Sequence, residues 1–462
     1  MTASPIDTNA DMVPTQESGP SPLPRGPHQL SPEDVQDNQR ARLIDAFLEL
    51  VGLQGYAATS VADVVQRSGV SRRSFYELFP NRAELLRMAF EVSSASMLEQ
   101  AEASLERSGS GAAARLEALM RPLCRVAHER PGALALWSVE IAADSEGPRL
   151  RGALMDRYAE LIQGCMSAGG EPLMPYSLAV TLAGALHREI DATARDTRTR
   201  VTPELPSRLA QWASCYYPLP PGLQLESAQP IGLDRSGLIG GRAPGTLTPL
   251  PDSYVPRIGG ASSGFRAHAN RERILDAVAQ ITAESGSAAL GGQAILDRAE
   301  VPENFFRAEF KNATGAFIAA LELGHMKGQA VVERARAEAP SWREGVQAAV
   351  HALLDFFASE PYFTRLAFID APFAWPASAH RAHEHAAAYA RLMFSGAPRR
   401  RRPVPLAPAL TSHALIELVF RATVNDRLDE LPRAAAEATY LALAPFVGGA
   451  EAGEAASAAV SS

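Results

Sequence analysis

The chain has 462 residues, of which 46% are apolar, and a formal charge of −8 at neutral pH. This length suits two to four domains, and the acidic balance argues against a protein that coats nucleic acid non-specifically. Any nucleic-acid surface must therefore be local. Because only Lys311 and Lys327 are lysines among 44 basic residues, arginine must supply nearly every cationic contact.

Targeting and catalytic signals are missing from the sequence. The first residues contain no basic stretch followed by an apolar core, and no apolar run approaches the roughly 18 residues of a membrane span. We therefore expect a cytoplasmic protein without a membrane partner. The widely spaced Cys124, Cys165 and Cys215 fit buried thiols in a reducing compartment, and a thiol redox sensor stays open as an alternative. No catalytic constellation or phosphate loop is present, so we expect neither an enzyme nor a cofactor.

Shifts in composition divide the chain. Residues 1–38 are rich in Ser, Pro, Asp and Gln, and residues 218–266 are rich in Pro and Gly. The sequence predicts a disordered tail (1–38), a helix-turn-helix domain (39–90), a helical regulatory domain (91–217), a linker (218–266), a second helix-turn-helix domain (267–321), a second helical regulatory domain (322–448) and a disordered tail (449–462).

The first of the two similar halves begins with four short helical patterns. Apolar residues from Leu43 to Val51 recur with helical spacing, and Gly55 follows where a helix C-terminus is expected. Ser60 begins a capping box, Ser71 is a natural N-cap for a helix that buries two phenylalanines, and Asn81 caps the next helix. Further helical patterns follow at about 83–107, 112–130, 131–145, 149–168, 174–196 and 203–216, and no segment alternates as a strand does. The fold class is all-α.

The turn between two short helices points to DNA recognition. A recognition helix enters the major groove by its N-terminal end, which therefore needs small or cationic residues, while its other face needs bulky anchors. Ser71, Arg72, Arg73 and Ser74 meet the first requirement, and Phe75 and Phe79 meet the second. Helix N-termini at Ser60 and Asn81 offer backbone N–H groups to phosphates.

The pattern resembles the tetracycline-repressor (TetR) family of bacterial transcriptional regulators. The resemblance rests on Gly55-Tyr56, Thr59-Ser60-Val61, Ser68-Gly69-Val70-Ser71, Ser74-Phe75-Tyr76 and the run from Phe79 to Leu86. It implies a DNA-binding unit followed by a helical domain that dimerises and encloses a small-molecule pocket. It also implies that phosphates are held by Thr59, Ser60, Tyr76, Asn81 and Arg82, that base edges are read by Arg72, Arg73 and Ser74, and that Ser71 belongs to the same DNA-binding surface.

A second copy of the motif begins 231 residues later. Residues 271–321 match residues 40–90 at 13 of 51 positions without a gap, and many of the other pairs exchange one apolar residue for another. The sequence therefore predicts a tandem duplication. Residues 71–82 carry a charge of +2, from three arginines and Glu77, whereas residues 302–313 carry zero. We interpret the second copy as a degenerate unit without DNA contact, and a divergent unit with unusual specificity is the alternative.

The regulatory segments give weaker predictions. In the first half, a pocket lining is predicted from Trp137, Glu140, Met155, Tyr158 and Ile162; in the second half, from residues 363–375 and 386–394. His380, His383 and His385 are interpreted as a solvated helix face and not as a metal site.

These observations predict a DNA-binding transcriptional regulator, a repressor released by an unknown small-molecule effector. It would bind a palindromic operator in double-stranded DNA as a homodimer or an intrachain pseudo-dimer, and lie with the nucleoid when bound. The competing hypothesis is a ligand- or protein-binding scaffold with vestigial DNA binding.

Overall fold

The computed structural model describes residues 31–460, except 139, 145, 168–172, 196–200, 224, 226–262 and 399–403. The described residues form helices and turns, with no strand among them, so the predicted all-α class is confirmed. The tail at 1–30 and most of the linker at 218–266 lie outside the described residues. None of the described helices is long and apolar enough to cross a bilayer.

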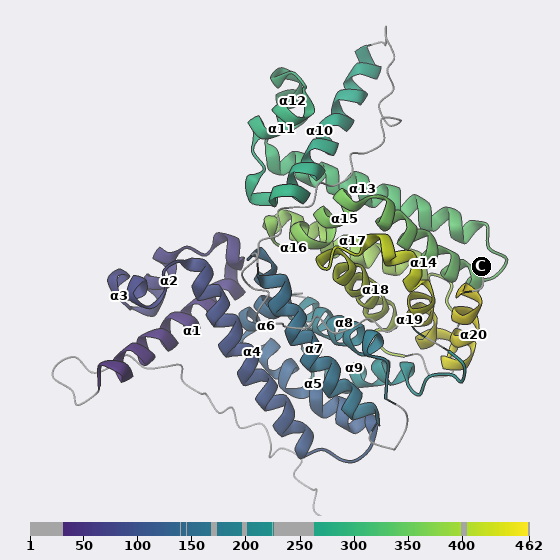
Figure 1. Ribbon diagram of the computed structural model, residues 1–462, viewed down its shortest axis with the longest axis horizontal. Helices are drawn as coiled ribbons and strands as arrows, with labels where there is room; N and C mark the ends of the chain where they lie inside the picture. The colour runs from purple at the N-terminus through teal and green to yellow at the C-terminus, as the bar shows by residue number, and fades with distance from the viewer. Residues whose placement is uncertain are drawn as a thin grey trace, which may run out of the picture.

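The first half begins with a compact helical unit that projects from the body (Figure 1). Its helices, and those that follow it, are α1 (Pro32–Ala58), α2 (Val61–Ser68), α3 (Arg72–Leu78), α4 (Arg82–Glu106), α5 (Ala112–Glu129), α6 (Pro131–Ser138), the 3₁₀ turn η1 (Glu140–Ala143), α7 (Gly147–Met166), α8 (Tyr176–Arg195), α9 (Leu205–Ala213) and the 3₁₀ turn η3 (Ser214–Tyr216).

The second half repeats much of this order. It comprises α10 (Ser263–Ser285), η6 (Ser287–Ala289), α11 (Gly292–Ala299), α12 (Glu303–Glu309), α13 (Ala313–Ala337), α14 (Trp342–Ser359), α15 (Pro361–Arg365), the π-helical η7 (Leu366–Asp370), α16 (Ala371–Ala374), α17 (Pro376–Phe394), α18 (Ala407–Val424), η8 (Leu428–Ala434), α19 (Ala435–Val447) and α20 (Gly449–Val460).

Helices α11, α12 and α13 begin and end 231 residues after α2, α3 and α4. The turns that join them also agree in backbone conformation. Gly69, after α2, has φ 65°, and Glu300, at the matching place after α11, has φ 50°. A positive φ is uncommon for a residue with a side chain, so the packing around this turn must impose the conformation.

Two predicted boundaries differ from the structure. Residues 449–462 were expected to be a disordered tail, but α20 covers 449–460 and packs against α19 through the buried Ala452 and Ala456. Alanine favours helices and its small side chain lets two helices approach closely, which composition alone did not reveal. At the other end, α1 begins at Pro32 and not near residue 39, because Ser31 and Asp34 form a capping box.

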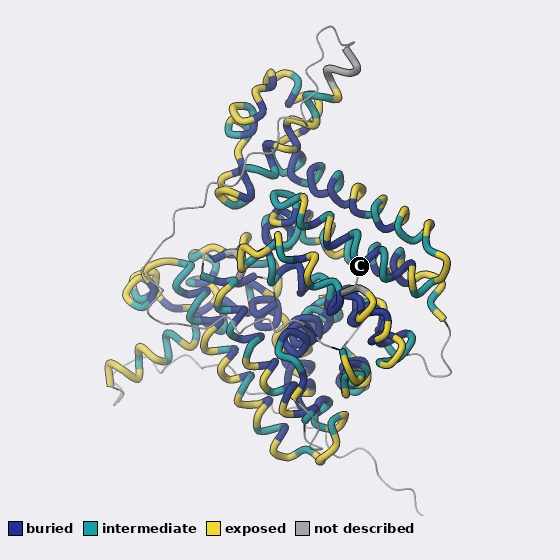
Figure 2. Tube along the Cα trace, turned by 45° about the vertical axis from the view of Figure 1, so that its right-hand side comes forward, coloured by how far each residue is buried: buried dark blue, intermediate teal, exposed yellow. Residues whose placement is uncertain are grey.

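The two halves meet in a buried interface, in which α8 packs against α18. Figure 2 shows buried residues in dark blue gathered in the middle of the molecule and exposed residues in yellow along its outer helices. Glu417 lies at its centre and is completely buried. Its two carboxylate oxygens accept hydrogen bonds from Arg151 at 2.7 and 2.8 Å, and Arg188 donates a third at 3.0 Å. Gly184 makes room for this carboxylate, since a Cβ there would lie 2.2 Å from the Glu417 side chain.

Candidate nucleic-acid interface and central cavity

Helix α3 is held by its apolar face and capped at its first turn. The Ser71 hydroxyl accepts a hydrogen bond from the Ser74 backbone N–H at 3.0 Å, which confirms the predicted N-cap. Phe75 and Phe79 are buried, with ring centroids 5.8 Å apart. Because this face anchors the helix, its opposite face points outward from the molecule.

The outward face of α3 carries the residues predicted to read DNA. Arg72, Arg73 and Tyr76 are exposed, and the Arg73 side chain retains 89% of its accessible surface. Arg73 donates a hydrogen bond to Glu77 at 2.9 Å, and the Arg72 guanidinium lies 5.9 Å from the Tyr76 ring centroid. Both arginines can therefore turn toward a ligand without uncovering the core.

Two neighbouring helix starts flank this face. Ser60 accepts a hydrogen bond from the Asp63 backbone N–H at 3.2 Å, and Asn81 accepts one from the Glu84 N–H at 2.9 Å. Both caps are exposed, as the prediction of phosphate contacts at Ser60 and Asn81 requires. The free N–H groups at the N-termini of α2 and α4 are suited to anions.

Two other predicted phosphate contacts do not fit the structure. Thr59 is fully buried, and its hydroxyl donates to the Gly55 carbonyl at 2.8 Å, so a phosphate cannot reach that side chain. Arg82 is half-buried over the Tyr56 ring at 4.2 Å and donates to the Tyr56 and Thr59 carbonyls at 3.2 and 2.5 Å. Arg82 thus satisfies carbonyls at the end of α1, a structural role that the motif alone did not reveal.

The matching helix of the second half, α12, has a different charge pattern. Over its seven residues the charge is −1, from Arg307, Glu303 and Glu309, whereas α3 carries +1, from two arginines and Glu77. Arg307 donates to Glu303 at 2.7 Å, and Arg271 donates to Glu309 at 2.6 Å. The side chain that caps α3 also has no counterpart, because Pro302 precedes α12 without a side-chain hydrogen bond.

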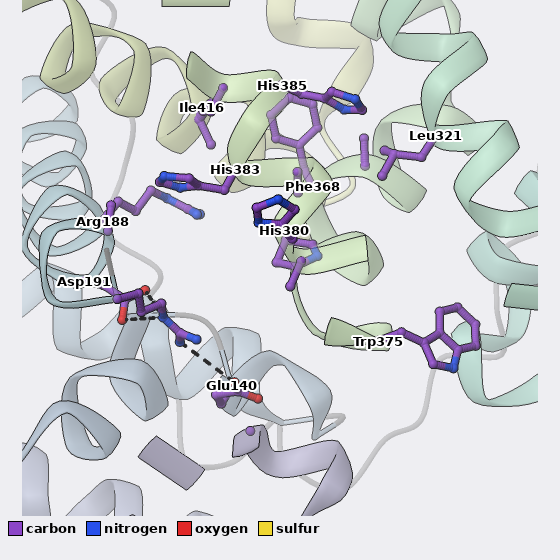
Figure 3. A pocket seen from close by; sticks show the side chains of 18 of the residues that line it. Glu140, Arg188, Asp191, Leu321, Phe368, Trp375, His380, His383, His385 and Ile416 are labelled. Carbon is purple, nitrogen blue, oxygen red and sulfur yellow. Dashed lines mark hydrogen bonds and ion pairs between the residues drawn. The ribbon is translucent and has the colours of Figure 1, made fainter. Parts of the chain in front are cut away.

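A cavity of about 960 Å³ lies where the end of α1, η1 and α8 face α13, α17 and α18 (Figure 3). Of the five first-half residues predicted to line a pocket, only Glu140 does so. The remaining four, Trp137, Met155, Tyr158 and Ile162, are buried in the core. The second-half segments contribute more, including Phe363, Phe368 and Trp375 from residues 363–375, and Ala386 and Tyr389 from 386–394.

Sequence reasoning missed the polar lining of this cavity. Arg188, Asp191 and Arg195 reach it from α8, and His380, His383 and His385 reach it from α17 (Figure 3). The helical spacing of α8 contained the only signal, because i, i+3 and i+7 positions share one face.

Glu140 connects the cavity to the DNA-binding unit. Its carboxylate accepts a hydrogen bond from the Tyr56 backbone N–H at 3.2 Å and lies 3.8 Å from Arg195. Burial raises the pKa of Glu140, and Arg195 opposes that shift. The contact falls directly after Gly55, where φ is 79° and α1 is kinked. The carboxylate therefore fixes the end of α1 against η1.

The second half has the same contact. Gly286 has φ 77°, and the next residue, Ser287, donates its backbone N–H to Asp370 at 2.8 Å. Burial raises the pKa of Asp370 to about 6, despite the hydrogen bond from Ser287. We call the pairs Tyr56–Glu140 and Ser287–Asp370 the two carboxylate latches.

Three of the histidines that line the cavity have close partners. His325 and His385 stack with ring centroids 3.7 Å apart, His385 lies 3.3 Å from Glu322, and His413 lies 3.1 Å from Glu189. Within the described ranges, no three His, Cys, Asp or Glu side chains gather as a metal site would require.

Comparison with known proteins bears on the first helix-turn-helix unit. Residues 43–89 match the family model for bacterial regulatory proteins of the tetR family. An uncharacterized HTH-type transcriptional regulator of Mycobacterium tuberculosis (strain CDC 1551 / Oshkosh) is 29% identical over 192 residues, which span 37% of this chain and 97% of that protein. An uncharacterized HTH-type regulator of strain ATCC 25618 / H37Rv matches with the same values.

Two solved structures are similar at low identity. The fatty acid degradation regulator FadR from Bacillus halodurans matches at 17% identity and a TM-score of 0.33, over 36% of this chain and 92% of that one. A TetR family transcription regulator from Marinobacter aquaeolei VT8 matches at 16% identity and a TM-score of 0.31, over 38% and 97%. The family match and the helix-turn-helix geometry of α2 and α3 agree that residues 43–89 form a helix-turn-helix unit of the kind found in bacterial regulatory proteins of the tetR family.

Proposed function

We propose that this protein is a ligand-released repressor that reads DNA through α3 alone. The observation that carries the proposal is the contrast between α3 and α12. Helix α3 presents two exposed arginines and a tyrosine, whereas α12 presents Glu303 and Arg307 paired with each other. Phosphates repel a carboxylate and attract an arginine, so α3 and α12 would differ in affinity for DNA even though they occupy matching positions in the two halves.

The roles within the first unit follow from exposure. Arg72, Arg73, Ser71 and Ser74 face base edges, because they occupy the first turn of α3. Ser60, Tyr76 and Asn81 hold phosphates, because they are exposed beside that turn. Thr59 and Arg82 take no part in DNA contact, since both hold the end of α1.

The two halves act as an intrachain pseudo-dimer that arose by tandem duplication. Three features support this proposal. The matched helices are offset by 231 residues, the interface around Glu417 is buried, and nearly the whole length of the mycobacterial relatives corresponds to only 37% of this chain. Each chain then offers one competent unit, and two chains place their α3 helices in successive major grooves of a palindromic operator.

The effector acts through the end of α1. The cavity is lined by residues 51–55, by Ala57 and Ala58 and by Glu140, which also holds Tyr56 in the first latch. A ligand that binds there more tightly when the latch is open shifts the population toward arrangements that do not fit the operator.

Fluorescence anisotropy with DNA from upstream of the protein's own gene tests the DNA-binding proposal. Arg72→Ala and Arg73→Ala should each weaken the specific complex about 5- to 150-fold, since a good bidentate arginine contributes about 1–3 kcal/mol. Arg307→Ala is the matched control, because Arg307 lies on the exposed face of α12 and should not change affinity. Equal effects in both helices, or no salt-dependent binding by the wild type, would favour a scaffold with vestigial DNA binding.

A further inference from the structure

One wall of the central cavity carries the arginines Arg188 and Arg195 and the carboxylates Asp191 and Glu140, and a buried charged cluster lies behind it. Arg151 already forms a two-point pair with Glu417, and Arg188 shares that same carboxylate through a single hydrogen bond. Two guanidinium groups therefore face one carboxylate. The next carboxylate along α8, Asp191, is paired with Arg195 at 2.9 Å.

Arg188 is the arginine of this group that reaches the cavity. Arg151 is 1% exposed and does not line the cavity, whereas the Arg188 side chain is 13% exposed and lines it. In Figure 3, Arg188 points into the space between α8 and the second half. Because Arg188 shares the Glu417 carboxylate with Arg151, its guanidinium is suited to a further charge-assisted hydrogen bond with an anion in the cavity.

The opposite wall is apolar and aromatic. Phe363, Phe368, Trp375 and Ile416 line the cavity from the second half. His325 adds little charge at neutral pH, because burial and the adjacent His385 lower its pKa to about 4. The volume of about 960 Å³ is at the upper end of the usual range for small-molecule sites, roughly 300–1,000 Å³.

We propose that the cavity between the halves binds a small amphipathic anion. Its carboxylate or sulfonate pairs with Arg188, and its aromatic or long aliphatic body lies against Phe363, Phe368 and Trp375. This inference deepens the proposed function, because it names the chemical class of the effector. Both halves contribute to the site, so neither half alone completes it.

The probe 8-anilinonaphthalene-1-sulfonate has this chemistry, and N-phenyl-1-naphthylamine is its neutral counterpart without the sulfonate. Fluorescence titration of the full chain without DNA should show one site per chain for the anionic probe. Arg188→Gln should weaken that probe about tenfold, because the variant loses the charge-assisted hydrogen bond to the sulfonate, and leave the neutral probe within about twofold. Retained binding of the neutral probe also shows that the variant is folded.

Three further variants locate the site. Arg188→Lys keeps the charge and should keep most of the affinity for the anionic probe, and Ala379→Trp fills the cavity and should abolish binding of both probes. Arg208→Gln, at an exposed position on α9 outside the cavity, should change neither. The proposal is overturned if the wild type binds no anionic probe, if Arg188→Gln affects both probes equally or neither, or if Ala379→Trp has no effect. Because DNA is left out, these results do not depend on whether α3 reads an operator.

Discussion

Replacing Glu417 by Gln tests how the two halves are held together. The substitution keeps the size of the side chain and removes its charge. In the wild type, Arg151 and Arg188 both donate to this completely buried carboxylate. In the variant, two guanidinium groups stay close together without an anion between them, and a buried charge without a partner is costly.

The magnitude can be worked out in two ways. Breaking a buried ion pair by removing one partner costs about 3–5 kcal/mol. Burial acts to raise the pKa of Glu417, but Arg151 and Arg188 outweigh it and lower the pKa from 4.5 to about 2. That difference corresponds to about 3 kcal/mol of stability, which is present above pH 4.5 and is lost as the pH falls toward 2. Both routes predict a loss of about 3–5 kcal/mol at neutral pH.

Urea denaturation followed by tryptophan fluorescence measures this loss. Trp212 is a suitable reporter, because its indole N–H lies 3.4 Å from Thr411 across the interface. Glu430→Gln is the matched control: Glu430 accepts a hydrogen bond from Arg427 at the surface, and its loss should leave the unfolding midpoint nearly unchanged. If Glu417→Gln unfolded at the same midpoint as this control, the buried cluster would not stabilise the interface.

Two further predictions concern contacts between helices of the same half. Gly132→Ala should destabilise the protein by about 1–3 kcal/mol, because the new Cβ would lie 1.8 Å from the Leu48 carbonyl oxygen. Gly164→Ala is the control and should not destabilise the protein, because the space around Gly164 is open. Equal unfolding midpoints for the two variants would contradict the account. Because burial raises the pKa of Asp370 to about 6, its ionised form destabilises the fold, and stability should rise as the pH falls from 6 toward 3.8. Asp370→Asn keeps an acceptor for Ser287 and should raise stability above pH 6 by about 2–3 kcal/mol; a variant with the unfolding profile of the wild type between pH 4 and 8 would refute this.

The sequence predicted the features that depend on neighbouring residues. Ser60, Ser71 and Asn81 cap their helices as expected, because a cap involves residues only three positions apart. The apolar spacing likewise predicted α4, α5, α7, α8 and α9 within a few residues, whereas the helix predicted over 131–145 ends at Ser138 and is followed by the 3₁₀ turn η1.

The features that depend on distant residues were not predictable in the same way. Arg151 and Glu417 are separated by 266 positions, and Tyr56 and Glu140 by 84. No local pattern distinguishes these residues from ordinary surface charges. The motif also suggested phosphate contacts for Thr59 and Arg82, although the carbonyls at the end of α1 occupy both side chains. A sequence motif shows which residue occupies a position, but it does not show which other groups the fold places beside that residue.

Photo-crosslinking to DNA tests the central claim of one competent unit most directly. The photoreactive residue p-benzoylphenylalanine would replace Tyr76 on α3 or Arg307 on α12, two exposed positions that are 231 residues apart. Crosslinks to bound upstream DNA from position 76 but not from position 307 are the predicted result. Equal crosslinking from both positions would contradict the account.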